Sequence, residues 1–420
     1  MRKALKKVLG EEKYDFFFDK FLEYFFTKED AKFFASLGFN CIRIPVNYRH
    51  LEDDMDPGVY LERGFQWIDR IVNICAAESV YTIIDLHTAP GGQNPDWHCD
   101  SGLHKAMFWE HIEFQDRTIG IWKAIAQRYK SNAWVAGYNP LNEPALEEVG
   151  LLLKFYERAE TAIREVDPDH IIYWDGNTFA ADFSKFENPL PNSVYACHDY
   201  STFGFPNFPI YTGSLEQKES LVKTFERKTS FQEKIQGPIW NGEWGPVYAS
   251  PDDGPDWKAV NEVRYRVLKD QLAIYEERKV SWSIWLYKDI GFQGMVYASP
   301  DTPYIKRLKP FLQKKKRLAA DSWGADLSTV AHITKPIENW LTQEVPGILH
   351  RYPPTWKPNK HVGRLIRNIL LSEELYPEYA AYFEGLSFEE LDQMAASFKF
   401  ENCIQRQGLN DAIKPKPSME

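Results

Sequence analysis

The sequence predicts an α/β protein built on a (β/α)8, or TIM, barrel, and three observations indicate this fold. Short apolar runs alternate with amphipathic stretches of helical spacing over about residues 27–300. Polar and aromatic side chains stand at the end of nearly every apolar run. The chain has 420 residues, of which 44% are hydrophobic and 26% charged, so it can bury a large core. This composition excludes a disordered chain, a coiled coil and a small disulfide-rich fold.

The apolar runs follow a regular order along the chain. Thr27 and Asp30 can cap a helix that ends at Gly38. The runs after it predict strands in seven segments: 39–46, 80–87, 135–144, 170–176, 193–200, 238–245 and 281–288. Strands that alternate with helices are parallel and are covered by helices on both faces. A closed barrel needs eight strands. Because the aromatic segment 14–26 has helical spacing, the first strand is predicted to be missing or atypical.

The last hundred residues differ in character from the rest. Residues 1–320 are predicted to form the catalytic barrel domain, and residues 321–420 a C-terminal helical extension packed on it. Basic residues cluster within 306–317, where a solvated face of the last barrel helix is favoured over a nucleic-acid or nuclear-import patch. The proline-rich segment 345–359 predicts an extended connector, and 361–400 predicts helices, one of them started by a Ser387–Glu390 capping box. The end of the chain is expected to fray.

Charge and cysteine usage predict the environment of the protein. The net charge of −10 disfavours broad binding to nucleic acids or anionic membranes. The amphipathic N-terminal segment does not resemble a signal peptide, and no apolar run is long enough to predict a membrane-spanning helix. The five cysteines are widely spaced and include no CxxC pair, which favours free thiols and a cytoplasmic location.

The polar residues at the strand ends are the candidates for function. The carboxyl ends of barrel strands open onto one face, so these side chains are expected to meet. Each residue alone has a simpler structural explanation, such as a hydrogen-bonding or packing role. Together they place two glutamates among polar and aromatic groups, and burying so many polar groups is costly without a task. The candidates are Arg43, His87, Asn142, Glu143, His198, Tyr200, Glu243 and Trp285.

Two carboxyl groups at one barrel face suit the hydrolysis of glycosidic bonds. One carboxyl protonates the leaving oxygen while the other attacks the anomeric carbon. The negative charge of Glu243 disfavours a second charge, so Glu143 is expected to keep its proton to higher pH. Arg43 and Tyr200 are expected to stabilise the ionised nucleophile. This chemistry requires neither a cofactor nor a metal ion.

The ordered set resembles glycoside hydrolase family 5, the cellulase-like members of clan A, over about residues 27–300. That family carries an Arg on its second strand, a His after the third, an Asn-Glu pair on the fourth and a His-x-Tyr on the sixth. A Glu on the seventh strand and a Trp on the eighth complete the pattern. This chain matches with Arg43, His87, Asn142 with Glu143, His198 with Tyr200, Glu243 and Trp285, in that order.

The resemblance implies a role for each matched residue. Glu143 would be the acid/base and Glu243 the nucleophile, with net retention at the anomeric carbon. Asn142 would hold the sugar 2-hydroxyl and His198 would support the acid/base. Trp285 would form the floor of the −1 subsite.

Further features resemble a fungal intracellular-type branch that includes β-glucosidase-like and disaccharide-releasing enzymes. The DLHTAPGGQNPDW segment is similar to a cleft-narrowing loop of exo-acting relatives. Trp97, Trp109, Phe203 and Trp244 are then candidate platforms for a second sugar or an aglycone, with ordinary packing as the alternative. Relatives also have a first strand and a Gly-Gly-Trp-type segment before the aromatic helix. Their absence here predicts an open seam between the second and eighth strands.

The favoured hypothesis is a retaining glycosidase acting on β-glucosides, diglycosides or short β-glucan ends, with a β-linked saccharide as its partner. The main alternative is a non-catalytic or destabilised carbohydrate-binding barrel from a shortened chain. A metal hydrolase would use His87, His98, Asp100 and His104, but no HExxH motif is present. A Schiff-base enzyme would use Lys288. The sugar, the aglycone, exo or endo cutting and the oligomeric state stay open.

Overall fold

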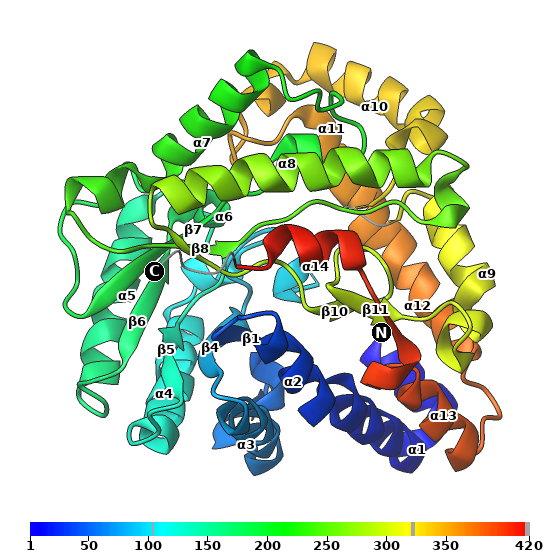
Figure 1. Ribbon diagram of the computed structural model, residues 1–420, viewed down its shortest axis with the longest axis horizontal. Helices are drawn as coiled ribbons and strands as arrows, with labels where there is room; N and C mark the ends of the chain where they lie inside the picture. The colour runs from blue at the N-terminus through cyan, green and yellow to red at the C-terminus, as the bar shows by residue number, and fades with distance from the viewer. Residues whose placement is uncertain (103–104, 321–323, 416–420) are drawn as a thin grey trace.

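Seven parallel strands form the centre of the protein (Figure 1). The computed structural model describes residues 1–420 except 103–104, 321–323 and 416–420. Each strand pairs in parallel with the next one along the sheet, in the order β1-β4-β5-β6-β7-β8-β9. The strands are β1 (Cys41–Asn47), β4 (Tyr81–Thr88), β5 (Val135–Asn139), β6 (Ile171–Asp175), β7 (Ser193–His198), β8 (Ile239–Glu243) and β9 (Ser281–Trp282). The predicted α/β barrel class is confirmed.

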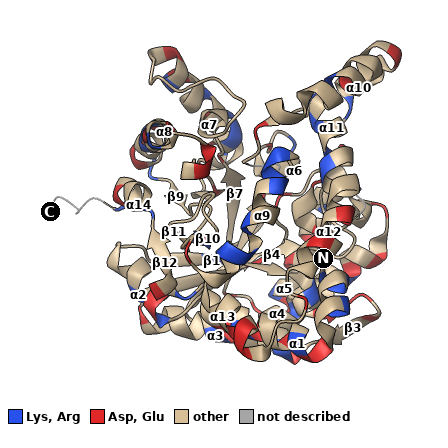
Figure 2. Ribbon diagram, turned by 90° about the vertical axis from the view of Figure 1, so that its right-hand side faces the viewer, with Lys and Arg blue, Asp and Glu red and all other residues tan. Residues whose placement is uncertain are grey.

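Amphipathic helices connect these strands and cover the outside of the sheet. In α3 the buried residues Phe65, Ile68, Val72 and Cys75 recur every three or four positions, which is the spacing of one helix face. That face packs into the core beside β4. The connecting helices are α2 (Lys28–Ser36), α3 (Glu62–Ala77), α4 (Ile112–Tyr129), α5 (Val149–Arg164), α6 (Asn177–Ala180), α7 (Leu215–Lys234) and α8 (Trp257–Glu277). Acidic and basic residues are interspersed along the ribbon of the helices (Figure 2).

The barrel has an open seam, as the sequence predicts. Among the described residues, β1 pairs only with β4, and β9 pairs only with β8. The chain enters β1 from two helices, α1 (Arg2–Phe25) and α2, with no strand between them. A cavity of about 450 Å³ lies at the seam, lined by Ile42 of β1, Trp282 of β9 and aromatic side chains of α1. Pro45 of β1 lacks an N–H group, which suits a strand at a sheet edge.

The aromatic N-terminal helix connects the seam to the C-terminal extension. Phe21 and Phe25 of α1 line the seam cavity, so the helix covers part of the open edges. The other end of the same helix packs against helices near the C-terminus, where Leu5 and Phe17 share a buried cluster with Phe383. The aromatic residues of α1 therefore pack this helix against both the barrel seam and the C-terminal extension.

The C-terminal extension is helical, as predicted, and adds one strand. Its helices include α10 (Ala331–Glu344), α11 (Pro358–Arg364), α12 (Ser372–Ala381), α13 (Phe388–Ala396) and α14 (Gln407–Ile413). The capping boxes of Thr27 with Asp30 and of Ser387 with Glu390 both form. Strand β12 (Cys403–Gln405) pairs with β11 (Val296–Ala298), and β11 pairs with β10 (Lys288–Asp289). The boundary at residue 320 stays a prediction.

Two further predictions concern the ends of the chain and its basic cluster. The predicted frayed end overlaps residues 416–420, which lie outside the described residues. The basic residues of 306–317 lie on α9 (Pro303–Arg317), where Lys314 and Lys316 pair with Glu378 and Asp253 at 2.5 and 2.6 Å. These pairs agree with a solvated helix face. None of the described helices is long and apolar enough to cross a membrane.

A buried ion pair next to the seam generates the first prediction. Lys288 Nζ lies 2.5 Å from Asp30 Oδ1, and both side chains are fully buried. Lys288 also donates to the Phe398 carbonyl at 2.9 Å, and the Tyr287 hydroxyl donates to Asp30 at 2.8 Å. These contacts give Lys288 a structural role, so the structure offers no support for the Schiff-base alternative.

Replacing Lys288 with Met is expected to lower the free energy of unfolding by about 3–5 kcal/mol, because it leaves the Asp30 carboxylate buried without its counter-ion. Urea denaturation of the wild type and the variant measures this change. The double variant Asp30→Asn, Lys288→Met should recover part of the loss. A change below about 1 kcal/mol in the single variant would show that the pair does not stabilise the fold.

Candidate active site

The carboxyl ends of the parallel strands bring the predicted residues together. Arg43 lies on β1, His87 is the next-to-last residue of β4, and Glu143 follows β5. His198 ends β7 and Glu243 ends β8. His198 and Glu243 are partners in the register of the β7–β8 pair. The strand ends therefore set the positions of these side chains, and the site forms on the face that the sequence predicts.

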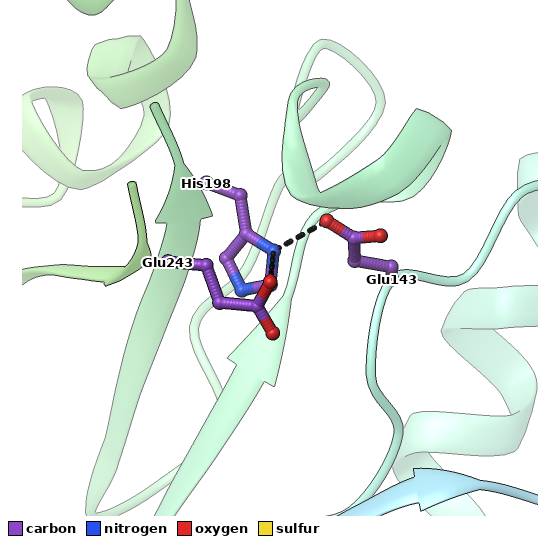
Figure 3. A group of neighbouring side chains, drawn as sticks. All are labelled: Glu143, His198 and Glu243. Carbon is purple, nitrogen blue, oxygen red and sulfur yellow. Dashed lines mark hydrogen bonds and ion pairs between the residues drawn. The ribbon is translucent and has the colours of Figure 1, made fainter. Parts of the chain in front are cut away.

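The two glutamates face each other across His198 (Figure 3). His198 Nδ1 lies 2.6 Å from Glu143 Oε1 and 3.7 Å from Glu243 Oε2. One carboxylate oxygen of each glutamate and one ring nitrogen of His198 all lie within 4.8 Å of one another. This close spacing is typical of carboxyl pairs in retaining glycosidases, where the two groups are roughly 5 Å apart.

Backbone contacts hold Glu143 in an unusual conformation. Its φ angle of 47° lies in the left-handed region, which costs a non-glycine residue about 1 kcal/mol or more. Asp175 Oδ2 accepts the Glu143 N–H at 2.9 Å, and Asn94 Nδ2 donates to the Glu143 carbonyl at 2.8 Å. These hydrogen bonds to the N–H and to the carbonyl of Glu143 stabilise the turn and direct the side chain to the site.

Burial gives Glu143 the proton affinity of an acid that works near neutral pH. Burial raises the pKa of Glu143 to about 7. The positive charge of Arg43 opposes the shift, and His98 would oppose it only with a protonated ring. The direction agrees with the sequence prediction, but the cause differs. Burial dominates, and the negative neighbours that add to the shift are Asp96 and Asp85 rather than Glu243.

Glu243 lies in a different electrostatic environment. Arg43 Nη1 donates to Glu243 Oε1 at 2.6 Å, and the Tyr200 hydroxyl donates to Oε2 at 3.1 Å. The Arg43 guanidinium also lies 3.0 Å from Asp85 Oδ2 and donates to Asn142 Oδ1 at 2.6 Å. A buried positive charge and a hydroxyl donor thus converge on one carboxylate.

The remaining predicted residues line the same site. Asn142 Nδ2 is buried with no hydrogen-bond partner in the described part of the chain, so it is available to a ligand hydroxyl. The rings of His87 and Trp285 stack at 5.3 Å between centroids and 11° between planes. Burial lowers the pKa of both His87 and His198 to about 4, so both imidazoles are neutral near pH 7.

Several functional residues lie outside the predicted set. Asp85 and Asp175 are fully buried, and burial raises their pKa values to about 7 and 6. Asp175 ends its strand as the predicted residues do, so the same positional signal identifies it. His98 is named from the sequence only as a ligand in the metal hypothesis. Its Nε2 lies 3.2 Å from Glu143 Oε2, and its loop position gives no signal for this contact.

The four aromatic platform candidates differ in exposure. The side chain of Trp97 is 47% exposed and stays a candidate. Trp244 is fully buried between Tyr275 and Trp282, so its prediction as a platform is wrong and its role is packing. The Trp109 indole N–H donates to the Gln93 carbonyl, and Phe203 packs on Tyr211. Both of these residues contact the hydrophobic core.

The contacts favour a metal centre neither in the loop that carries Asp100 nor at the group of Glu143, His198 and Glu243. Asp100 pairs with Arg49 at 2.9 Å, and the His104 of the metal hypothesis lies outside the described residues. The group of Glu143, His198 and Glu243 has a geometry that could hold a metal ion. The Arg43 guanidinium already contacts Glu243, and a fixed positive charge there disfavours a second one. We do not assign these residues as metal ligands.

A parallel α/β barrel with two facing glutamates, one beside Arg43 and one beside imidazoles, defines the protein as a glycosidase. The chain belongs to the Cellulase family, glycosyl hydrolase family 5, which matches residues 16–291. It is 54% identical over 426 residues to a "Beta-xylosidase" of Phanerodontia chrysosporium, covering 100% of this chain and 90% of that protein. It is 25% identical over 343 residues to "Endoglucanase C" of Acetivibrio thermocellus, covering 72% and 95%.

Solved structures show the same fold. The "Clostridial cellulose synthase subunit Z" of Clostridioides difficile superposes with a TM-score of 0.52 at 23% identity, covering 64% of this chain and 86% of that one. The Thermotoga maritima Cel5A in complex with cellobiose superposes with a TM-score of 0.50 at 21% identity, covering 62% and 83%. At these identities the likeness establishes the barrel fold alone.

The raised pKa of Glu143 predicts a pH-dependent effect on stability. The folded protein holds this proton up to about pH 7, whereas the unfolded chain releases it near 4.5. The stability that the proton contributes is complete below pH 4.5 and is lost as the pH rises to 7. A Glu143→Gln variant lacks this loss, so it should be more stable than the wild type at pH 8, by on the order of 3 kcal/mol.

Denaturant unfolding at pH 5 and pH 8 measures this difference. Asp85 and Asp175 titrate in both proteins, so the comparison isolates Glu143. Equal stability differences at the two pH values would mean that Glu143 is not protonated in the folded state near neutrality.

Proposed function

We propose that the protein is a retaining β-glycosidase that uses Glu143 as the acid/base and Glu243 as the nucleophile. The observation that carries the proposal is the spacing of the two carboxylates, bridged by His198, together with their contrasting surroundings. A retaining mechanism needs one protonated and one ionised carboxyl group close together. Burial raises the pKa of Glu143, and Arg43 and Tyr200 donate to Glu243.

The reaction proceeds in two displacements. Glu243 attacks the anomeric carbon while Glu143 gives its proton to the departing glycosidic oxygen, which forms a glycosyl-enzyme ester. Glu143, now a carboxylate, then takes a proton from water, and the water oxygen displaces Glu243. Asn142 Nδ2 donates to a sugar hydroxyl beside the nucleophile in this proposal, which is supported by its lack of a partner among the described residues and by the Arg43 bond to Oδ1. Trp285, stacked on His87, supports the sugar face.

The proposed substrates are β-linked glycosides: β-glucosides, β-diglycosides or short β-glucan ends. The relative from Phanerodontia chrysosporium is named a β-xylosidase, which supports adding β-xylosides to this class. The alternative, a non-catalytic or destabilised carbohydrate-binding barrel, has no support, because both carboxylates are present and hydrogen-bonded. The cytoplasmic location stays a prediction, and the five cysteines are free, as expected in a reducing compartment.

A panel of nitrophenyl β-glycosides tests the proposal and identifies the sugar. The panel contains β-glucoside, β-xyloside, β-cellobioside and β-xylobioside, with the α-anomers as controls. We expect release of nitrophenol from at least one β-glycoside and from none of the α-glycosides. A Glu243→Gln variant should lose activity by several powers of ten, because the nucleophile is gone. Activity that persists in this variant would contradict the assignment.

The acid/base role predicts a dependence on the leaving group. A Glu143→Ala variant should lose kcat/KM far more on an alkyl glycoside, which needs protonation, than on a dinitrophenyl glycoside, which does not. Azide should speed turnover of the activated substrate in this variant, because a small anion does not need a general base. Similar losses on both substrates would contradict the acid/base assignment.

The stereochemical outcome is a separate prediction. Carboxylates close enough for covalent catalysis should release the sugar first as its β-anomer. Proton NMR of the first minutes of the reaction, before mutarotation, reports the anomer that forms. Early appearance of the α-anomer would indicate inversion and exclude Glu243 as a nucleophile.

A further inference from the structure

Glu143 contacts a second imidazole in addition to His198. His198 Nδ1 lies 2.6 Å from Glu143 Oε1, and His98 Nε2 lies 3.2 Å from Oε2, so each carboxyl oxygen faces a ring nitrogen. His98 belongs to a short turn, η2 (Trp97–Cys99), in the loop that follows β4. His198 contacts Oε1 of Glu143, and His98 approaches the other oxygen, Oε2.

Asn94 defines the protonation of His98 Nε2. Asn94 Oδ1 accepts the N–H of Asp96 at 2.9 Å, and Asn94 Nδ2 donates to the Glu143 carbonyl at 2.8 Å. These two bonds fix which end of the amide is the nitrogen. The second N–H of Nδ2 therefore points at His98 Nε2, 2.7 Å away, and we assign Nε2 as an acceptor without a proton.

We propose that His98 is a positioning residue that holds Glu143 in its protonated form. Its Nε2 lone pair is shared between two donors, the Asn94 N–H at 2.7 Å and the Glu143 carboxyl O–H, whose oxygen lies 3.2 Å away. This inference rests on the proposed function, because it assigns a partner to the proton that Glu143 delivers. An acceptor opposite Oε2 stabilises the neutral carboxyl and disfavours the carboxylate, whose lone pairs would face the lone pair of the imidazole. It also fixes the direction of the O–H before the leaving oxygen takes the proton.

The surroundings of Glu143 are consistent with a neutral His98. The titratable or charged groups that act on Glu143 or lie beside it come from five strands and their loops: Arg43, Asp85, Asp96, His98, Asp175, His198, Tyr200 and Glu243. Burial lowers the pKa of His98 below its usual value, although Glu143 and Asp96 oppose the shift. A neutral ring has one nitrogen without a proton, and the contact with Asn94 places that nitrogen at Nε2.

The C-terminal extension holds the turn that carries His98. Asp96 Oδ1 accepts the N–H of Trp97 at 2.9 Å, and Asp96 Oδ2 pairs with Lys360 of α11 at 3.4 Å. Trp356, just before α11, stacks on Phe179 at 5.5 Å and 17°. Phe179 in turn contacts the His98 ring at 6.3 Å. The extension therefore contacts the N-cap of the η2 turn through Lys360, and it reaches the His98 ring through Phe179.

Two matched substitutions of His98 test the proposal. His98→Leu fills most of the space without an acceptor, whereas His98→Gln offers an amide oxygen at about the same place. The measurement is kcat/KM against pH, on an alkyl glycoside and on a dinitrophenyl glycoside of the sugar that the panel identifies. Only the alkyl glycoside needs the proton of Glu143.

On the alkyl glycoside, kcat/KM of His98→Leu should fall at a pH roughly 0.5–1 unit lower on the alkaline side of the profile (the alkaline limb) than in the wild type. The reason is that one hydrogen bond to the neutral acid is lost. His98→Gln should keep the limb near the wild-type position. On the dinitrophenyl glycoside, both variants should stay within about twofold of the wild type. A limb that does not move in His98→Leu, or moves equally in both variants, would overturn the proposal.

Two controls separate the possible failures. If thermal melting shows that His98→Leu does not fold, His98→Phe replaces it as a ring-shaped variant without an acceptor and is judged by the same criteria. The Glu143→Ala variant is measured alongside on both substrates. If Glu143→Ala loses similar activity on both substrates, the proposed function is refuted. If it loses far more on the alkyl glycoside while the alkaline limb of His98→Leu does not move, only the role of His98 is refuted.

Discussion

The buried guanidinium of Arg43 is the interaction on which the rest of the site depends. It lies on the edge strand β1, which has one strand partner, and it contacts Asp85 on β4 and Glu243 on β8. One positive charge thus joins strands on both sides of the open seam. Burial alone would lower the pKa of Arg43, but the carboxylates of Asp85 and Glu243 outweigh it and raise the pKa above its usual value. The guanidinium therefore stays charged, and its hydrogen-bond partners are the carboxylates and amide oxygens around it.

The two glutamates differ because this charge is not shared equally between them. Glu243 receives two donors, from Arg43 and Tyr200, whereas Glu143 faces two imidazoles in a buried position. A low pKa keeps the His198 imidazole neutral near pH 7, so it adds no positive charge that would ionise Glu143. This distribution of one charge and several neutral rings supports the proposed division of the two glutamates into an acid and a nucleophile.

Sequence patterns could predict the fold and most of the site because strand ends are set by local periodicity. His87, Glu143 and Glu243 follow apolar runs, and parallel topology brings such ends to one face. Patterns could not reveal what depends on burial and long-range contacts. The cause of the Glu143 pKa shift, the full burial of Trp244 and the approach of His98 all require the tertiary structure. The helical spacing before residue 27 predicts a helix and not a strand there, but only the structure shows α1 covering the seam.

The central proposal is that Glu243 attacks as the nucleophile and Glu143 protonates the leaving oxygen in the same cleavage event. The most direct measurement is mass spectrometry after incubation with a 2-deoxy-2-fluoro glycoside that carries an activated leaving group, which slows the release of a covalent intermediate. We expect a mass increase of one fluorosugar, located by peptide sequencing on Glu243. A label on Glu143, or an active enzyme that turns the reagent over without any covalent adduct, would contradict it.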